Sequence, residues 1–239
     1  MPSLSVLSYN IHHGEGMDGE IDLGRIAAVI RSVNPDLVAL QEVDQRTERT
    51  NGVDQAAVLS RMTGMEAVFG ASFPYQGGAY GNAVLSRLRA KASSVELFRG
   101  SEEREQRSFL AVDLNWTATD EPLYLLATHF DFDRDPQDRL ASVDAINRWV
   151  ASRPAGRALL AGDLNAVLGG DALNALAREW TVADEGAPTP TVPVNDPERQ
   201  IDFILYRPSA RWRVEEVRVL TNESVASDHL PILVRLTSA

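Results

Sequence analysis

Carboxylates, carboxamides and imidazoles recur in this sequence at the C-terminal ends of short apolar runs that are expected to form strands. Strands that lie side by side in one sheet bring the polar residues at their ends together in space. An edge of this kind is where an active site is usually built. The residues concerned are Asn10, Glu42, His129 with Asp131, Asp163 with Asn165, Asp202, and Asp228 with His229.

Taken one at a time, these residues also have purely structural explanations. Asn10 could cap a turn, and Gly162–Asn165 could be a strand-exit turn closed by an Asx hydrogen bond. His129 could be a half-buried histidine with its hydrogen bonds satisfied, and Ser227–Asp228 could be a turn before a final strand. The recurrence of strand-end positions made only of groups that bind metals or transfer protons nevertheless favours a catalytic site over a series of unrelated turns.

The residue types that are rare in the chain exclude several other chemistries. Cysteine is absent from the 239 residues, which excludes disulfides, cysteine zinc sites and thiol nucleophiles. Any metal must therefore bind oxygen and imidazole ligands, which favours Mg²⁺, Mn²⁺ or Ca²⁺. Lys91 is the only lysine, so Schiff-base chemistry and a lysine-bearing phosphate loop find no support. No serine lies in a Gly-x-Ser-x-Gly motif, which argues against an α/β-hydrolase.

The charge balance is acidic, with 34 acidic and 23 basic side chains and a net charge of −11. Such a field repels phosphate on average and argues against broad, non-specific nucleic-acid binding, although a local cleft could still be positive. The N-terminal residues show no secretory signal, and no apolar run approaches the roughly 20 residues that span a bilayer. We therefore expect a cytoplasmic protein with one domain over residues 1–239, and a monomer by default.

The apolar periodicity predicts about four helices among more numerous strands. Asp22 and Asp135 are expected to be N-caps, with Pro136 at the first helical position, and Gly64 is expected to end the second helix. The helices are expected at 23–34, 55–62, 136–150 and 171–179. Strands are expected at 5–11, 36–42, 83–86, 93–98, 109–116, 123–128, 157–161, 201–206, 213–220 and 231–236. Because several strands are consecutive with short connections, mixed or antiparallel sheets with helices packed outside fit best.

Seven segments together resemble the endonuclease/exonuclease/phosphatase superfamily, and they span positions 8 to 231. They are Ser8–His12 (SYNIH), Leu40–Val43 (LQEV), Gly81–Arg87 (GNAVLSR), Ala127–Phe130 (ATHF), Ala161–Asn165 (AGDLN), Gln200–Ile204 (QIDFI) and Ser227–Pro231 (SDHLP). The resemblance implies an α+β fold, a four-layer α/β sandwich in which two mixed β-sheets pack face to face with helices on both outer faces.

The resemblance also implies a role for each matching residue. Glu42 corresponds to the principal metal carboxylate, and Asn10 and Asp228 complete an oxygen shell that suits Mg²⁺, with Mn²⁺ able to substitute. Asp163 corresponds to the residue that orients or deprotonates the attacking water, and Asn165 to the amide that holds a phosphate oxygen.

The two histidines of the resemblance are implied to contact the phosphate. His129 corresponds to the imidazole at the scissile phosphate, and His229 to a second imidazole whose tautomer Asp202 would fix. Whether Asp163 or His229 is the general base stays open at this point.

Further residues could bind substrate. Asn82 falls where family members place a contact to the phosphate or to the first histidine, and Arg107 could direct its guanidinium to phosphate oxygens. A solvated salt bridge between Arg107 and Glu102, Glu103 or Glu105 is the alternative. Residues 47–52 (TERTNG) form a candidate substrate loop, and His12 and His13 could line the cleft or be exposed.

These observations predict an Mg²⁺-dependent phosphoesterase that hydrolyses a phosphate mono- or diester by in-line attack of an activated water. A small molecule or a lipid headgroup is the expected substrate, because the chain is acidic and has few lysines. An endo- or exonuclease acting on DNA or RNA is the alternative within the same chemistry. A binding module that has lost catalysis is a remote alternative, since every residue of the set is present.

Overall fold

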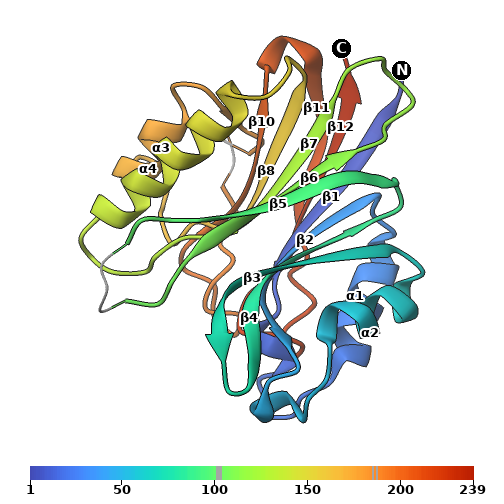
Figure 1. Ribbon diagram of the computed structural model, residues 1–239, viewed down its shortest axis with the longest axis vertical. Coiled ribbons are helices and arrows are strands. Elements are labelled where there is room, and N and C mark those ends of the chain that lie inside the picture. The colour runs from blue at the N-terminus through green and yellow to red at the C-terminus, as the bar shows by residue number, and fades with distance from the viewer. Residues whose placement is uncertain (101–103, 185, 187) are drawn as a thin grey trace.

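Two β-sheets packed face to face form the centre of the computed structural model (Figure 1). The structure describes the chain from residue 1 to 239 except residues 101–103, 185 and 187. The strands are β1 (Ser3–Asn10), β2 (Leu37–Gln45), β3 (Glu66–Tyr75), β4 (Gly78–Ser86), β5 (Ala90–Leu97), β6 (Ser108–Leu114), β7 (Leu123–His129), β8 (Arg157–Asp163), β9 (Thr181–Val182), β10 (Asp202–Arg207), β11 (Trp212–Val219) and β12 (Ile232–Ser238).

In the described part of the chain, four α-helices cover the outer faces of the sheets. They are α1 (Leu23–Val33), α2 (Gln55–Thr63), α3 (Gln137–Ala151) and α4 (Asp171–Leu176), and short 3₁₀ turns lie at η1 (His12–Gly14), η2 (Glu48–Thr50) and η3 (Ser209–Arg211). None of the helices in the described part of the chain is long and apolar enough to cross a membrane.

Both sheets have six strands and are mixed, as the spacing of the strands predicts. Their orders are β11-β12-β1-β2-β4-β3 and β5-β6-β7-β8-β10-β9. Strands β1 and β2 pair in parallel, as do β7 and β8, whereas the other paired strands of the described residues are antiparallel.

Three buried clusters hold the four layers together. Val6, Leu125 and Ile232 belong to the cluster between the two sheets. Ile30 of α1 belongs to a second cluster on the outer face of the first sheet, and Ile146 of α3 to a third cluster on the outer face of the second sheet. Figure 1 shows α1 and α2 on one side of the sheet pair and α3 and α4 on the other. The predicted four-layer sandwich is therefore confirmed.

The predicted ends of the first two helices agree with the structure. Asp22 caps α1 by accepting hydrogen bonds from the backbone N–H groups of Gly24 and Arg25. Gly64 ends α2 in the left-handed region at φ +71°, a conformation that costs glycine little.

The structure corrects two predicted helix boundaries and adds a strand. Pro136, not Asp135, is the N-cap of α3, and Asp135 instead accepts the backbone N–H of Gln137 through its side chain. Helix α4 ends at Leu176 instead of Glu179, because the chain turns there so that Trp180 is buried. Strand β3 was not predicted. It is a sheet edge that contains Gly70 and Pro74, two residues that weaken a strand pattern but are tolerated at an edge.

The polar residues meet at one edge, but not all of them at C-terminal strand ends. Asn10, His129 and Asp163 are the last residues of β1, β7 and β8. Asp202 instead begins β10, and Asp228 and His229 precede β12. Both of these strands run antiparallel to their neighbours, so their beginnings lie where β8 and β1 end.

Candidate active site

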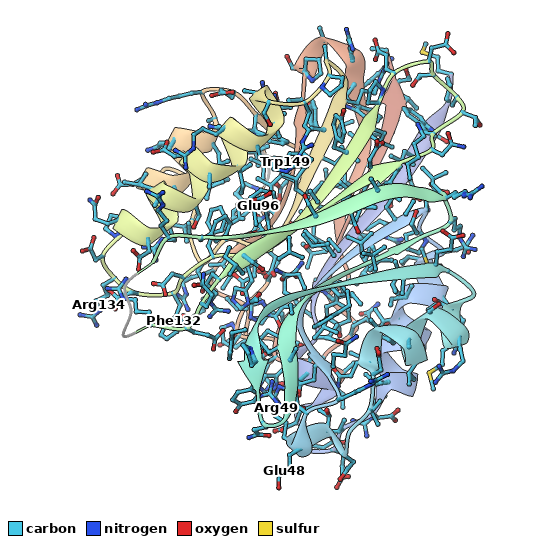
Figure 2. All side chains as sticks on the ribbon, viewed as in Figure 1. Glu48, Arg49, Glu96, Phe132, Arg134 and Trp149 are labelled. Atoms are coloured by element: carbon cyan, nitrogen blue, oxygen red, sulfur yellow. The ribbon has the colours of Figure 1, made fainter. Side chains whose placement is uncertain are left out.

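A cavity of about 360 Å³ lies at this edge, where loops of the two sheets meet, and it is called the site cavity below. Its lining residues are His12, His13, Glu42, Arg49, Phe73, Tyr75, Tyr80, Glu105, Arg107, His129, Phe132, Asp163, Asn165 and His229. Figure 2 labels Arg49, from the loop after β2, and Phe132, from the loop after β7. The two sheets therefore both contribute to its walls.

Asp163 is the most deeply placed carboxylate of the site cavity, with 2 % of its surface exposed. Its Oδ1 accepts the backbone N–H of Asn165 at 2.9 Å, and its Oδ2 accepts the Asn10 amide at 3.2 Å. Burial, and after it the nearby Asp202 carboxylate, raises the pKa of Asp163 to about 7. A carboxylate with a pKa near neutrality is suited to accept a proton from a water molecule.

His229 faces Asp163 on one side and is held by Asp202. Its Nδ1 donates to Asp202 Oδ2 over 2.9 Å, and its Nε2 lies 3.7 Å from Asp163 Oδ2. Thr191 donates its hydroxyl to the same Asp202 oxygen at 2.6 Å. Burial lowers the pKa of His229, but the Asp202 carboxylate outweighs it and raises the pKa to about 10. His229 is thus an imidazolium at neutral pH, as its predicted pairing with Asp202 implies.

His129 flanks Asp163 on the other side and has the opposite charge state. Burial, followed by the neighbouring Arg107 cation, lowers the pKa of His129 well below its usual value. Arg107 Nη1 lies 2.9 Å from His129 Nδ1, and a guanidinium can only donate. The ring is therefore neutral, with Nδ1 as the acceptor for Arg107, and its Nε2 lies 3.4 Å from Asp163 Oδ2.

Asn165 completes the group around Asp163 and adopts a strained backbone conformation, with φ +44°. Its amide Nδ2 donates to the carbonyl of Phe130 at 3.0 Å and lies 3.1 Å from His129 Nε2. Positive φ is uncommon for residues other than glycine and costs of order 1 kcal/mol or more, so it persists only where the surroundings enforce it. His12, His13 and Glu42 share this feature, and they line the site cavity together with Asn165.

Glu42 reaches the site cavity through an irregularity in β2. The pairing of β2 with β4 shifts between Leu40 and Val43, and Glu42 there has φ +59°. A bulge of this kind re-aims a side chain out of the regular alternation. Glu42 Oε1 accepts the Asn10 amide at 3.0 Å, so Asn10 links Glu42 on the first sheet with Asp163 on the second.

The residues present fit a divalent cation at Glu42. Potential ligand atoms of His12, His13 and Glu42 lie within 4.8 Å of one another, and those of Asp163, Asp202 and His229 do so as well. The predicted ligands Asn10 and Asp228 are placed differently. Asn10 Oδ1 accepts the backbone N–H of His12. Asp228 accepts a hydrogen bond from the hydroxyl of Ser227 at 3.3 Å.

The two predicted substrate-binding residues have different surroundings. Arg107 lines the site cavity and pairs with Glu105 at 2.8 Å. Arg107 is only 8 % exposed, whereas Glu105 is exposed, so the expected salt bridge is present and is open to solvent on its Glu105 side. Glu102 and Glu103 lie outside the described residues. Asn82 is buried on β4, donates to the carbonyl of Ser108 at 3.2 Å, and is not among the residues that line the site cavity.

Sequence reasoning missed three parts of this arrangement. Thr191 lies in a proline-rich loop, where nothing in the sequence distinguishes it from the other threonines. Tyr75 and Tyr80 flank the tight turn Gln76–Gly77 between β3 and β4. The Gly-Gly pair at that turn is a hairpin signal that could have placed these aromatic side chains at the edge of a sheet.

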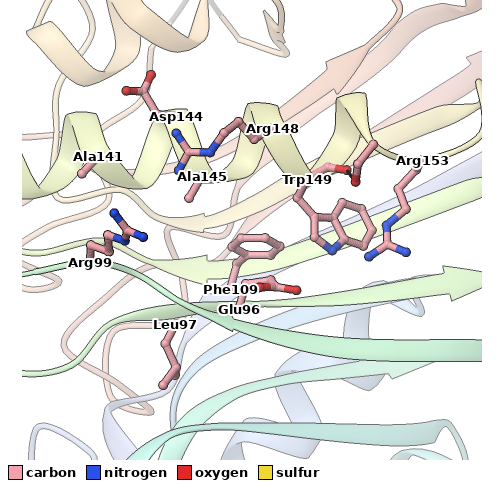
Figure 3. Close-up of a pocket in the computed structure, with 11 residues that line it drawn as sticks. Glu96, Leu97, Arg99, Phe109, Ala141, Asp144, Ala145, Arg148, Trp149 and Arg153 are labelled. Carbon is pink, nitrogen blue, oxygen red and sulfur yellow. Dashed lines mark hydrogen bonds between the residues drawn. The ribbon is translucent and has the colours of Figure 1, made fainter.

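A second and larger cavity of about 530 Å³ lies between β5 and α3, and it is called the α3 groove below (Figure 3). Its lining residues are Glu96, Leu97, Arg99, Phe109, Ala141, Asp144, Ala145, Arg148, Trp149, Ser152 and Arg153. Its five charged side chains are exposed, and none forms a hydrogen bond or ion pair with another residue of the described chain. Arg153 instead lies over the ring of Trp149, 4.4 Å from its centroid.

Comparison with known proteins gives a family match along nearly the whole chain. Residues 7–229 match the model of the Endonuclease/Exonuclease/phosphatase family. The comparison with curated proteins finds no match. The fold is shared with solved structures that are less than 25 % identical in sequence.

Three of these solved structures illustrate the range of sequence identity and structural similarity. An endonuclease/exonuclease/phosphatase from Beutenbergia cavernae is 24 % identical, with a TM-score of 0.82 over 100 % of this chain and 72 % of its own. A mannosyl-6-phosphatase from Bacteroides thetaiotaomicron is 19 % identical, with a TM-score of 0.80 over 98 % of this chain and 99 % of its own. The human Nocturnin catalytic domain, solved with a bound sulfate anion, is 17 % identical, with a TM-score of 0.77 over 100 % and 94 %.

Proposed function

Because this chain belongs to the endonuclease/exonuclease/phosphatase family, whose members are hydrolases of phosphoester bonds, we propose that it is an Mg²⁺-dependent hydrolase of small phosphoesters. Support comes from one arrangement, in which the buried Asp163 carboxylate lies between a neutral and a cationic imidazole. Such a site can accept a proton from water and stabilise the negative charge that develops on phosphate oxygens.

Asp163 acts as the general base in this proposal. Its pKa of about 7 leaves a large fraction ionised at neutral pH, while keeping it basic enough to take a proton from the attacking water. His229 is less suited to this role, because the Asp202 carboxylate keeps it protonated. Its imidazolium instead offers a proton and a positive charge to a phosphate oxygen. The general-base alternative that the sequence leaves open is thus resolved in favour of Asp163 in our proposal.

Arg107 and Asn165 hold the phosphate in place. The Arg107 guanidinium is fixed by Glu105 and His129, so its donors face the site cavity with little orientational freedom to lose on binding. The Asn165 amide is fixed by the carbonyl of Phe130. Donors that are already oriented stabilise transition-state charge without the cost of reorganisation.

Glu42 is the residue that would hold the divalent cation, with potential ligand atoms of His12 and His13 within 4.8 Å and the Asn10 amide hydrogen-bonded to its carboxylate. A bound Mg²⁺ would supply Lewis-acid stabilisation of the phosphate oxygens and of the leaving group. Asn10 would position Glu42 and Asp163 relative to each other, since its amide contacts both carboxylates.

A small phosphoester is the favoured substrate class, and a nuclease activity is the alternative. The net charge of −11 opposes long polyanions, because non-specific affinity for nucleic acid comes from basic side chains that neutralise phosphates. The mannosyl-6-phosphatase with this fold is named for a small phosphoester, which is in keeping with the same class here.

The test is a turnover screen with p-nitrophenyl phosphate, bis(p-nitrophenyl) phosphate, hexose phosphates, inositol phosphates, sphingomyelin and plasmid DNA. We expect EDTA to abolish turnover of the best substrate, and Mg²⁺ or Mn²⁺ to restore it. Glu42→Ala should raise the Mg²⁺ concentration needed for half-maximal activity, and Glu96→Ala in the α3 groove is the matched control. Full activity in EDTA would contradict the metal requirement. Plasmid nicking that falls steeply between about 50 and 200 mM salt would favour the nuclease.

A further inference from the structure

The site cavity contains an unusual set of apolar groups, and they bear on the identity of the leaving group. Every apolar side chain among its described lining residues is aromatic, and no aliphatic side chain takes part. An acyl chain would be bound by an aliphatic lining, which this cavity does not offer. Aromatic rings interleaved with carboxylates and guanidinium groups instead suit a ring that has an apolar face and a polar rim.

Three aromatic rings, packed edge-on or tilted against one another, and one guanidinium form a wall on the first sheet. Phe73, Tyr75 and Tyr80 contact one another, with ring centroids 5.2 to 6.4 Å apart. Arg49 lies over Tyr75 and Tyr80, 4.8 and 5.5 Å from their centroids. Arg49 also forms two hydrogen bonds with Asp44, which is fully buried. This wall is therefore fixed before any ligand binds.

Phe132 lies on the other sheet's side of the site cavity and has no such partner. All seven phenylalanines lie in the described part of the chain, and Phe132 is the only exposed one, at 70 %. No ring contact joins it to another described residue. Exposing a phenylalanine to this extent forgoes the stabilisation that burial would give, so its position needs another explanation.

The loop that carries Phe132 is built to hold it there. The buried Arg139 of α3 donates through one nitrogen to the carbonyls of Asp131 and Asp133, the two residues on either side of Phe132. The Asp131 carboxylate in turn accepts the backbone N–H of Asp133 at 2.8 Å. Arg104 pairs with both of these aspartates from outside the loop. The exposure of Phe132 thus belongs to an ordered loop.

The same loop is joined to the proposed catalytic residues. The backbone N–H of Phe130 donates to the carbonyl of Asp163 at 2.9 Å, and the carbonyl of Phe130 accepts the Asn165 amide at 3.0 Å. Phe132 is therefore held at a fixed offset from the residues that would bind the phosphate. A group attached to that phosphate would lie within reach of its ring.

We propose that Phe132 is a specificity-determining residue that stacks on a hydroxylated ring in the leaving group, so that ring-bearing phosphoesters are preferred over acyclic ones. Glu105 and Arg49 line the same cavity and can accept from and donate to the hydroxyl groups of such a ring. This inference rests on the proposed phosphoesterase function and narrows its substrate class. A free sugar phosphate and the ribose of a nucleoside monophosphate share this chemistry.

The test compares glucose 6-phosphate and adenosine 5′-monophosphate with glycerol 3-phosphate, which has a primary alcohol as its leaving group but no ring. For each substrate kcat/KM is measured in the wild type and in the Phe132→Leu, Phe132→Tyr and Leu97→Ala variants. Leucine keeps an apolar side chain but removes the ring, and tyrosine keeps the ring. Leu97 is an exposed apolar residue of β5 outside the site cavity and is the matched control.

We expect Phe132→Leu to lower the ratio of kcat/KM for the ring substrate to that for glycerol 3-phosphate by about three- to tenfold. Phe132→Tyr and Leu97→Ala should leave this ratio within about twofold. The ring substrate whose kcat/KM ratio falls shows whether the ring that stacks on Phe132 belongs to a sugar phosphate or to a nucleotide. An unchanged ratio in Phe132→Leu, or an equal loss on glycerol 3-phosphate, would overturn the proposal.

A binding measurement separates this inference from the phosphoesterase function. Saturation-transfer NMR in EDTA should show transfer from the wild-type protein to the ring protons of glucose 6-phosphate or adenosine 5′-monophosphate, and less transfer from Phe132→Leu. If glycerol 3-phosphate is hydrolysed but neither ring receives saturation, the inference fails and the proposed function stands. If rings bind at Phe132 but no phosphoester is hydrolysed with any metal, the proposed function fails instead.

Discussion

The smaller of the two cavities, the site cavity, has the buried and mutually contacting charged side chains, and the larger α3 groove does not. The groove is larger, at about 530 Å³ against about 360 Å³, yet its charged side chains are exposed and separate. In the site cavity Arg107, His129, Asp163 and His229 are buried and contact one another. Burial together with mutual contact is what shifts the pKa values of such groups away from their usual range.

The comparison teaches which feature of a cavity indicates chemistry. Volume reports only how much space two elements leave between them, and a helix resting on an edge strand leaves space for simple geometric reasons. Titratable groups that are forced together cost folding free energy, and so do residues such as Glu42 and Asn165 with positive φ. The buried titratable contacts and four of the residues with positive φ lie at the site cavity, as is typical of functional sites.

The largest expected effect comes from removing the proposed base. Asp163→Asn should lower kcat/KM for the best substrate of the screen by roughly 10³-fold, because an amide cannot accept a proton from water. Asp144→Asn is the matched change in the α3 groove and should alter kcat/KM by less than about twofold. Circular dichroism checks that both variants are folded. More than a tenth of the wild-type activity in Asp163→Asn would argue against Asp163 as the base.

Arg107 should have the next largest effect. Arg107→Ala removes a buried donor that faces the site cavity and leaves His129 without its partner at Nδ1, so kcat/KM should fall by roughly 10²-fold. Arg148→Ala makes the same change in the α3 groove and should be nearly silent. Equal losses from the two arginine variants would mean that general surface charge, and not the position of Arg107, governs activity.

Breaking the pairing of Asp202 with His229 should have a smaller effect. Asp202→Asn should lower kcat by about tenfold with little change in KM. Without the Asp202 carboxylate, the pKa of His229 should fall from about 10, because burial opposes protonation and only the Asp163 and Asp228 charges remain to raise it. Histidine NMR titration of the metal-free protein measures this shift.

A double variant tests whether the two residues act together. Asp202→Asn combined with His229→Ala should be no worse than His229→Ala alone, since Asp202 would act only through His229. Additive losses in kcat would show that the two side chains act separately.

The individual helices and strands could mostly be predicted from local patterns in the sequence, whereas the four-layer arrangement and the roles of the site residues were implied by the resemblance of seven segments to a known family. Alternating apolar runs, the Asp22 cap and Gly64 placed the main elements, and the motifs around Asp163 and His229 placed the polar edge. The sequence could not show that the N-terminal ends of β10 and β12 lie at this edge. Strand direction within a sheet depends on pairing between distant segments, as in Asp202 opposite Asp163.

The parts that were missed depend on tertiary contacts. The bulge that turns Glu42 toward the site cavity arises from the pairing of β2 with β4, and no residue type in the LQEV segment predicts it. The burial of Arg107 likewise depends on Glu105 and on His129, which is 22 residues away. The roles of Asn10 and Asp228 as metal ligands, and of Asn82 as a substrate contact, stay predictions.

The smallest catalytic effect is expected from Trp149, at the centre of the α3 groove, and it would sharpen the comparison most directly. The indole contacts the rings of Phe109 and Tyr124 edge-on and lies under Arg153, so it packs α3 onto the second sheet. Trp149→Ala should therefore lower the free energy of unfolding by about 2–3 kcal/mol, measured by urea denaturation. At 25 °C kcat/KM should nevertheless stay within about twofold of the wild type, because no residue of the site cavity contacts Trp149 through a ring or hydrogen bond in the described structure. Lost stability with intact catalysis would assign the groove to packing. A fivefold or larger loss of kcat/KM in a folded variant would instead show that the two regions are coupled through the second sheet, and the contrast between them would not hold.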